Sequence, residues 1–164
     1  MNLLFRFKKY CSYCLHARKG KYAHSPFVYQ LSTAVFEKKL PLSTTSSHHF
    51  DNDKYGKLTA KIADYLNVKT IASFPDNPAQ KADMTLINMT PKTENAYDYF
   101  KETIKYSDNN SVVIVKNIYC SPESAIVWEK IKTHPKTTVT FDMFQIGVVF
   151  FRRESSKENF IIKY

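Results

Sequence analysis

Residues 70–90 read TIASFPDNPAQKADMTLINMT and contain two short apolar runs separated by a polar link. The runs, 70–74 and 84–89, carry the β-branched and aliphatic side chains that are typical of strands. The link holds Pro75 and Pro78 but no glycine. This pattern predicts two strands joined by a short connection. It also raises the question of whether a turn without glycine can hold a cofactor.

Strand and helix patterns continue to alternate after residue 90, which predicts an α/β sheet with helices on both faces. The predicted elements are a helix over 93–106, a fully buried strand over 111–118, a helix over 121–134 capped by Ser121, strands over 137–144 and 146–151 that form an antiparallel pair, and a short last strand over 159–164.

The N-terminal section is predicted to be helical. Leu4, Phe7, Cys11, Cys14 and Leu15 recur at helical spacing, which predicts an amphipathic helix whose cysteines are small core residues.

A second helix is expected to begin at Ser25, an N-cap residue, with Pro26 at its first position. Its buried face would contain Val28, Leu31, Val35 and Phe36. A polar linker and a third helix over 57–67 follow, in which Leu58, Ile62 and Leu66 form an apolar stripe.

A chain of 164 residues with 43% apolar residues is expected to form a single domain, 1–164, with a helical section over 1–45 and an α/β core over 57–164. No apolar run approaches the roughly 18 residues of a membrane span, so no membrane partner is predicted. Three cysteines without a disulfide spacing, and no signal-peptide pattern, favour a cytoplasmic protein.

The net charge of +9 and the basic, aromatic N-terminus are compatible with a nucleic-acid-binding module. Because the lysines are spread along the whole chain, a solvating surface is the preferred interpretation.

Two groups of residues were weighed as metal ligands, and no metal site is predicted. Cys11 and Cys14, with His16 or His24, lack the second ligand pair that a structural zinc site needs. The other group lies in a polar loop and is interpreted as adventitious: His48, His49, Asp51 and Asp53.

Four segments resemble a bacterial branch of the class I S-adenosylmethionine-dependent methyltransferases related to the O-methyltransferases. They are HSPFVY (24–29), DMTLINMTPKTENAYDYF (83–100), SVVIVKNIYCSPESAIVWEKIKTHP (111–135) and TTVTFDMFQIGVVFFRRESSKENFIIKY (137–164). The resemblance implies a Rossmann-like sheet, mostly parallel with a C-terminal antiparallel pair, in shortened form because two strand–helix units after the first strand are missing. It also favours a parallel pair across the link, with one helical turn starting at Asn77; a hairpin is the alternative.

The family's glycine loop would follow the strand that matches residues 70–74. This chain has Ser73, Phe74 and Asp76 there, and its three glycines lie elsewhere. Asn88 and Lys116 stand where the resemblance implies acidic residues. Ser73, Phe74, Asp76 and Asn88 are therefore interpreted as a vestigial cofactor site, with no catalytic residues.

The leading hypothesis is a degenerate methyltransferase-like domain without catalysis or cofactor, acting as an interaction or assembly module. The alternatives are a methyltransferase that still binds S-adenosylmethionine, which leaves enzymatic activity open, and the nucleic-acid-binding module. Loss of the neighbouring strands would leave Thr70–Phe74 at a sheet edge, which predicts a homodimer through that edge unless the N-terminal helices cover it.

Overall fold

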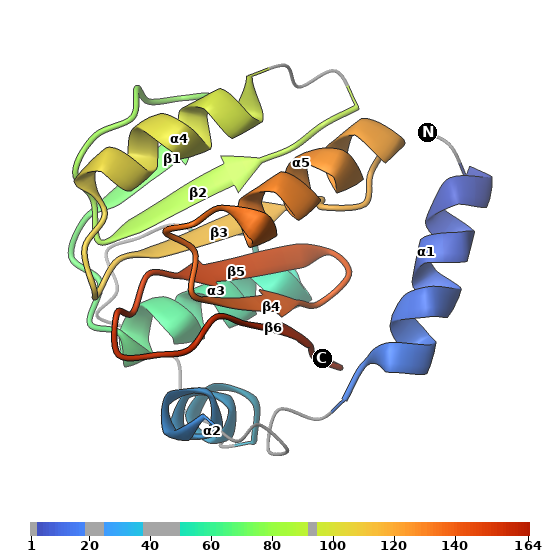
Figure 1. Ribbon diagram of the computed structural model, residues 1–164, viewed down its shortest axis with the longest axis horizontal. Helices are drawn as coiled ribbons and strands as arrows, with labels where there is room; N and C mark the ends of the chain where they lie inside the picture. The colour runs from blue at the N-terminus through green and yellow to red at the C-terminus, as the bar shows by residue number, and fades with distance from the viewer. Residues whose placement is uncertain (1–2, 19–24, 38–49, 92–94) are drawn as a thin grey trace.

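In a computed structural model, the chain forms a six-stranded mixed sheet with helices on both faces (Figure 1). The structure describes residues 3–18, 25–37, 50–91 and 95–164. The helices are α1 (Leu3–His16), α2 (Pro26–Ser32), the π-helix η2 (Thr33–Glu37), α3 (Lys54–Tyr65), α4 (Ala96–Tyr106) and α5 (Pro122–Thr133). The strands are β1 (Ile71–Phe74), β2 (Met84–Asn88), β3 (Val112–Lys116), β4 (Val139–Asp142), β5 (Ile146–Phe150) and β6 (Glu158–Ile161).

The strand order is β1-β2-β3-β5-β4-β6, so β1 forms one edge of the sheet. β1, β2 and β3 are mutually parallel, which confirms the parallel prediction for the first two strands. β5 runs antiparallel to both β3 and β4, and β6 pairs in parallel with β4. The predicted antiparallel pair and the short last strand are therefore confirmed.

The link between β1 and β2 contains no helical turn, so that prediction is wrong. Asn77 instead closes a turn on the end of β1: its backbone N–H donates to the Ser73 carbonyl at 2.6 Å, and its side-chain oxygen accepts from the Ser73 N–H at 3.2 Å. The Asn77 side chain bonds back to the strand instead of capping a helix.

The start of the β1–β2 pair is held by a second side chain. Asp83 accepts hydrogen bonds from the backbone N–H groups of Lys69 and Thr70, both at 2.9 Å, and from the Thr70 hydroxyl at 3.1 Å. These contacts fix the register where the two strands begin.

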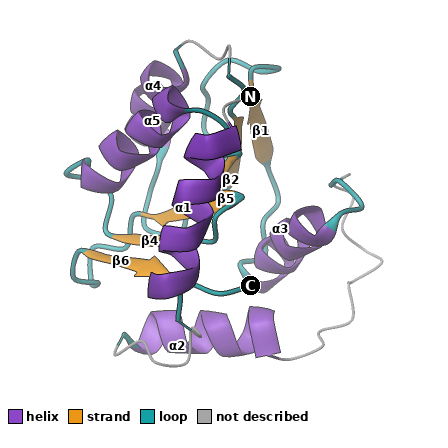
Figure 2. Cartoon of the chain, turned by 90° about the vertical axis from the view of Figure 1, so that its right-hand side faces the viewer, coloured by secondary structure: helices purple, strands orange, loops and turns teal. Residues whose placement is uncertain are grey.

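Two apolar cores lie on the two faces of the sheet. Side chains of α2 and α3, including Val28, Leu31, Leu58 and Ile62, pack against one face. Phe100 and Ile104 of α4 and Trp128 and Ile131 of α5 pack against the other. Figure 2 shows the sheet edge-on between these helices.

The predicted caps form where local sequence signals place them. Ser25 caps α2 and Ser121 caps α5, and each is followed by proline at the first helical position. Asp53 caps α3 through the Gly56 N–H at 2.6 Å, so this helix begins three residues before the predicted start. Val35 is buried as predicted, whereas the Phe36 side chain lies outside the described part of the chain.

The first helix forms, but its predicted buried face is wrong. Leu4, Phe7, Cys11, Cys14 and Leu15 are all exposed. The opposite side of α1 contacts the domain, because the sheet presents the rings of Tyr119 and Phe144 to it. The Lys9 ammonium lies over the Tyr119 ring, and the Tyr10 ring contacts that of Phe144. In the described part of the chain, no helix is long and apolar enough to cross a membrane.

Candidate functional site

The carboxyl ends of β1, β2 and β3 lie together because the three strands are parallel. We call this region the carboxyl edge and define it by Ser73, Phe74, Asn88, Lys116 and Asn117. Ligands of open α/β sheets bind outside such strand ends. The sequence-predicted residues Ser73, Phe74 and Asn88 all lie here, and Asp76 lies exposed on the turn that follows β1.

The backbone at the end of β1 is not open to a ligand. The Ser73 N–H donates to Asn77, and the Phe74 ring packs on Tyr99 of α4 with centroids 4.7 Å apart. The Tyr99 hydroxyl in turn donates to the Pro78 carbonyl at 3.5 Å. The turn thus folds against α4, and its polar groups are used within the chain.

The polar groups after β2 and β3 also bind each other. The Asn117 side-chain amide donates to the Asn88 side-chain oxygen at 2.9 Å. Asn117 has a φ of 61°, a left-handed conformation that asparagine tolerates well, and its N–H donates to the Gln145 carbonyl at 2.6 Å. Lys116 forms an ion pair with Asp51. A lysine at this position repels a metal cation.

A buried carboxylate lies at the end of β4, on the same side of the molecule. Asp142 is 3% exposed and accepts from the Tyr119 hydroxyl, from Trp128 Nε1 at 3.1 Å and from the Phe144 N–H at 3.0 Å. Burial, followed by the charge of Asp142, raises the pKa of the Tyr119 hydroxyl far above its ordinary value. The arrangement keeps Tyr119 a protonated donor, which suits a structural anchor rather than a general base.

Helix α1 lies across this end of the sheet (Figure 2). The Tyr10 ring meets Phe144 edge-on at 5.0 Å, and the Lys9 ammonium lies 5.1 Å from the centroid of the Tyr119 ring. The Tyr13 hydroxyl donates to the Ile162 carbonyl at 2.7 Å, and partial burial raises the pKa of Tyr13 to about 12. The helix is therefore fixed to the domain by its aromatic and basic side.

The residues weighed as metal ligands do not come together where they are described. Cys11 and Cys14 are exposed on α1, Asp51 pairs with Lys116, and Asp53 caps α3. His24, His48 and His49 lie outside the described residues. Among the described side chains, no group of three or more His, Cys, Asp and Glu residues could hold a metal ion.

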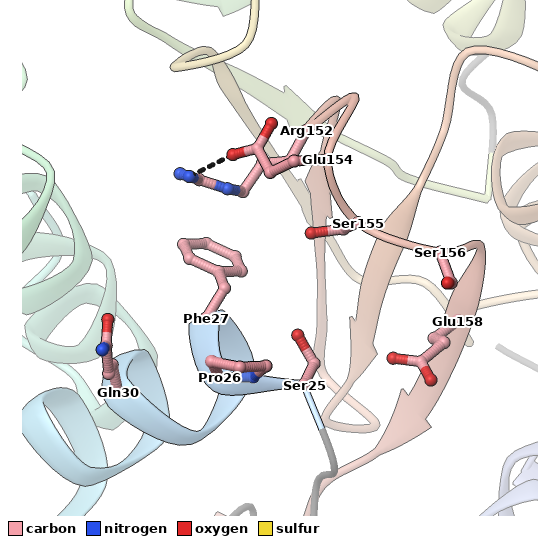
Figure 3. Close-up of a pocket in the computed structure, with 9 residues that line it drawn as sticks. All are labelled: Ser25, Pro26, Phe27, Gln30, Arg152, Glu154, Ser155, Ser156 and Glu158. Carbon is pink, nitrogen blue, oxygen red and sulfur yellow. Dashed lines mark ion pairs between the residues drawn. The ribbon is translucent and has the colours of Figure 1, made fainter.

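A cavity of about 500 Å³ lies at the opposite end of the sheet, between the start of α2 and the segment from β5 to β6 (Figure 3). We call it the amino-edge cavity, because β5 ends beside the start of β3. Its lining is polar apart from the side chains of Pro26 and Phe27. The other lining residues are Ser25, Gln30, Arg152, Glu154, Ser155, Ser156 and Glu158.

Phe27 and Arg152 form the wall of this cavity. The Arg152 guanidinium lies 4.3 Å from the centroid of the Phe27 ring, which itself meets Phe150 edge-on at 5.0 Å. Arg152 also pairs with Glu154, as the dashed line in Figure 3 marks. Its Nε is buried and has no hydrogen-bond partner among the residues that the structure describes.

Sequence analysis missed the amino-edge cavity and the Asp142 cluster. A signal for the cavity was present, because two of the segments that carry the resemblance, 24–29 and 137–164, supply all of its lining residues except Gln30. Nothing in the sequence marked Asp142, since an acidic residue at a strand end is usually exposed.

Comparisons of this chain with family models, with curated proteins and with solved structures give no match.

Proposed function

We propose that this chain is a shortened, Rossmann-like domain of the methyltransferase type that has no catalytic activity and acts as an interaction or assembly module. The observation that carries the proposal is the carboxyl edge. There the groups that a cofactor would need are bonded to other groups of the chain, Asn88 to Asn117 and Lys116 to Asp51.

The strand order supports the relation to that fold. The resemblance implies that two strands are missing beside the first strand, and β1 is an edge strand paired only with β2. The parallel β1-β2-β3 run followed by the antiparallel β5 is also compatible with the implied sheet.

The residues at the carboxyl edge do not fit S-adenosylmethionine. No glycine follows β1, the Ser73 N–H is taken by Asn77, and no carboxylate stands at the ends of β2 and β3. The Ser73 N–H is therefore not free for close approach of the cofactor, and no glycine lets the backbone come nearer.

Titration calorimetry with S-adenosylmethionine and S-adenosylhomocysteine tests the loss of cofactor binding. We expect no binding tighter than about 1 mM. Micromolar binding of either compound by protein with native circular dichroism would overturn the proposal and favour an active or cofactor-binding methyltransferase.

The proposed mode of assembly is a homodimer through β1. An edge strand can offer backbone groups to a second chain, and residues Ile71–Phe74 carry no charge. The Ser73 N–H and carbonyl are already bonded to Asn77, so pairing at that residue would have to replace these bonds. In the described part of the chain, α1 contacts Tyr119 after β3, Phe144 between β4 and β5, and Ile162 after β6, and none of these residues belongs to β1.

Sedimentation equilibrium at micromolar concentration tests the dimer, with an expected mass of twice 19.1 kDa. Ser73→Lys places a charge on the edge strand and should shift the protein to monomer. Gln80→Lys makes the same charge change on the exposed link and should leave the dimer intact. A wild-type monomer, or equal behaviour of the two variants, rules out assembly through β1.

A further inference from the structure

The outward side of α1 is an apolar stripe. It consists of six side chains, those of Leu3, Leu4, Phe7, Cys11, Cys14 and Leu15. At about 100° per residue, they fall within an arc of roughly 120° around the helix axis. Four are strongly exposed: Leu3 at 70%, Leu4 at 65%, Phe7 at 65% and Leu15 at 82%. Cys11 and Cys14 lie between them and are exposed as well. We call these six residues the α1 stripe. In Figure 2 no described helix or strand lies in front of α1.

The opposite side of α1 is fixed to the domain, so the stripe cannot turn inward without breaking contacts. Tyr13 is hydrogen-bonded to the Ile162 carbonyl. After the helix, Arg18 pairs with the end of the sheet: its N–H donates to the Ile161 carbonyl at 2.9 Å, and its carbonyl accepts from the Lys163 N–H at 2.9 Å. The apolar side thus faces outward, because contacts from both α1 and the segment after it hold the opposite side of the helix against the domain.

The charge around the stripe has one sign. The sequence has no acidic residue before Glu37. Arg6 and Lys9 lie over the rings of Phe144 and Tyr119 on the domain side of α1, so the cations outside that contact are Lys8 and Arg18. Lys8 borders the stripe and is exposed, as is Arg18. The chain as a whole carries a net charge of +9.

We propose that α1 lies on an anionic lipid surface, with the α1 stripe inserted among the acyl chains and the neighbouring cations at the headgroups. A helix with one apolar face and basic flanks is suited to this interface. The inference is independent of the proposed function. The absence of a membrane span does not bear on it, because a helix in the plane of the interface crosses nothing.

Charge selects the lipid surface over two other occupants. A second copy would bring a like-charged helix against the first, with no acidic partner for the cations. A nucleic acid needs cations directed toward its phosphates, whereas the centre of the outward arc is apolar and Lys9 lies over the Tyr119 ring. A bilayer can accommodate both features, because its acyl chains contact the apolar stripe and its headgroups contact the cations that border the stripe.

Flotation with vesicles tests the proposal on the full chain. One vesicle set is pure phosphatidylcholine, and the other contains one third phosphatidylserine. We expect binding to the anionic vesicles, weaker binding to the neutral ones, and a loss of the difference as salt screens the headgroups.

Three variants separate the apolar from the electrostatic contribution. Phe7→Gln removes one stripe side chain and should weaken binding about tenfold on both vesicle sets. Ser12→Gln changes an exposed residue outside the stripe on the same helix and should leave binding within about twofold. Lys8→Gln should weaken binding about fivefold on the anionic vesicles alone.

Circular dichroism confirms that each variant keeps its fold. The proposal is overturned if the wild type does not float with anionic vesicles, or if Phe7→Gln and Ser12→Gln bind equally. Salt-dependent binding to generic RNA or DNA in place of vesicles would assign the basic helix to nucleic acid. Dissociation of a dimer by Phe7→Gln, without vesicle binding, would assign the α1 stripe to a second copy.

Discussion

The two ends of the sheet differ in how their polar groups are satisfied. At the carboxyl edge, side chains at the ends of β2 and β3 pair with each other and with Asp51, and α1 lies across the nearby strand ends. At the other end, α2 and the β5–β6 segment leave a cavity of about 500 Å³. Its wall contains a buried guanidinium nitrogen that has no partner within the described part of the chain.

This difference reverses the usual expectation for an open α/β sheet, in which ligands bind at the carboxyl ends of the strands. Here the polar groups at those ends are bonded to one another, whereas the Arg152 Nε at the amino-edge cavity has no partner among the described residues. Substitutions at the two ends should therefore differ in their effects.

The largest effect is expected for Asp142→Ala. Removal of this buried carboxylate leaves the Tyr119 hydroxyl, the Trp128 indole N–H and the Phe144 N–H without their acceptor. We expect a loss of about 3–5 kcal/mol in the free energy of unfolding, measured by urea denaturation.

Asp76→Ala is the matched control, because it makes the same change at an exposed position beside the same edge. It should alter stability by less than about 0.5 kcal/mol. A cost below about 1 kcal/mol for Asp142→Ala would mean that this cluster does not hold the carboxyl end of the sheet together.

At the amino-edge cavity, the stacking of Arg152 on Phe27 should give a smaller and separable effect. Phe27→Ala should cost about 2 kcal/mol because the ring is half-buried against Phe150. Tyr29→Ala, on the same helix but exposed, is the control.

A double-mutant cycle with Arg152→Met isolates the contact between the guanidinium and the ring. We expect a coupling energy of about 0.5–1 kcal/mol. No coupling would show that the cavity wall is held by Phe27 and Phe150 alone.

Local signals in the sequence predicted most of the fold. Ser25–Pro26 and Ser121–Pro122 marked two helix starts, and the continuous apolar run of β3 marked a buried strand. These features depend on neighbours in the chain, so periodicity and capping residues are enough to find them.

The features that sequence analysis missed depend on distant partners. Tyr119 and Trp128 lie 23 and 14 residues from Asp142 along the chain, and they meet it only when α5 and the turn before it are placed against the sheet. For α1, the apolar spacing correctly indicated a helix with two faces. It could not indicate which face the domain would bind, because the aromatic rings that decide this come from Tyr119 and Phe144.

The Asp83 contacts should make stability depend on pH. Desolvation acts to raise the pKa of Asp83, but hydrogen bonds from Lys69 and Thr70 outweigh it and lower the pKa. A lowered pKa in the folded state stabilises the protein above the carboxyl's unfolded pKa, and this contribution is lost as pH falls through the folded value.

Asp83→Asn should therefore cost up to about 1 kcal/mol at neutral pH, since the group is largely exposed, and should flatten the loss of stability in acid. Urea denaturation across the acidic range measures this slope, and Asp76→Asn in the exposed link serves as the control. An unchanged slope for Asp83→Asn would show that its carboxylate does not hold the strand starts.

The smallest effect is expected where Asp51 meets Lys116. The Asp51 side chain is 67% exposed, so its carboxylate is well solvated, whereas the Lys116 side chain is 20% exposed. Asp51→Asn should lower the free energy of unfolding by less than about 1 kcal/mol, and about 1 M salt should remove the difference from the wild type. A cost above about 2 kcal/mol would mean that Lys116 is a buried cation dependent on this partner. A small cost means that the ammonium tolerates the loss of its carboxylate. In that case the positive charge itself, more than the ion pair, keeps cations away from the carboxyl edge.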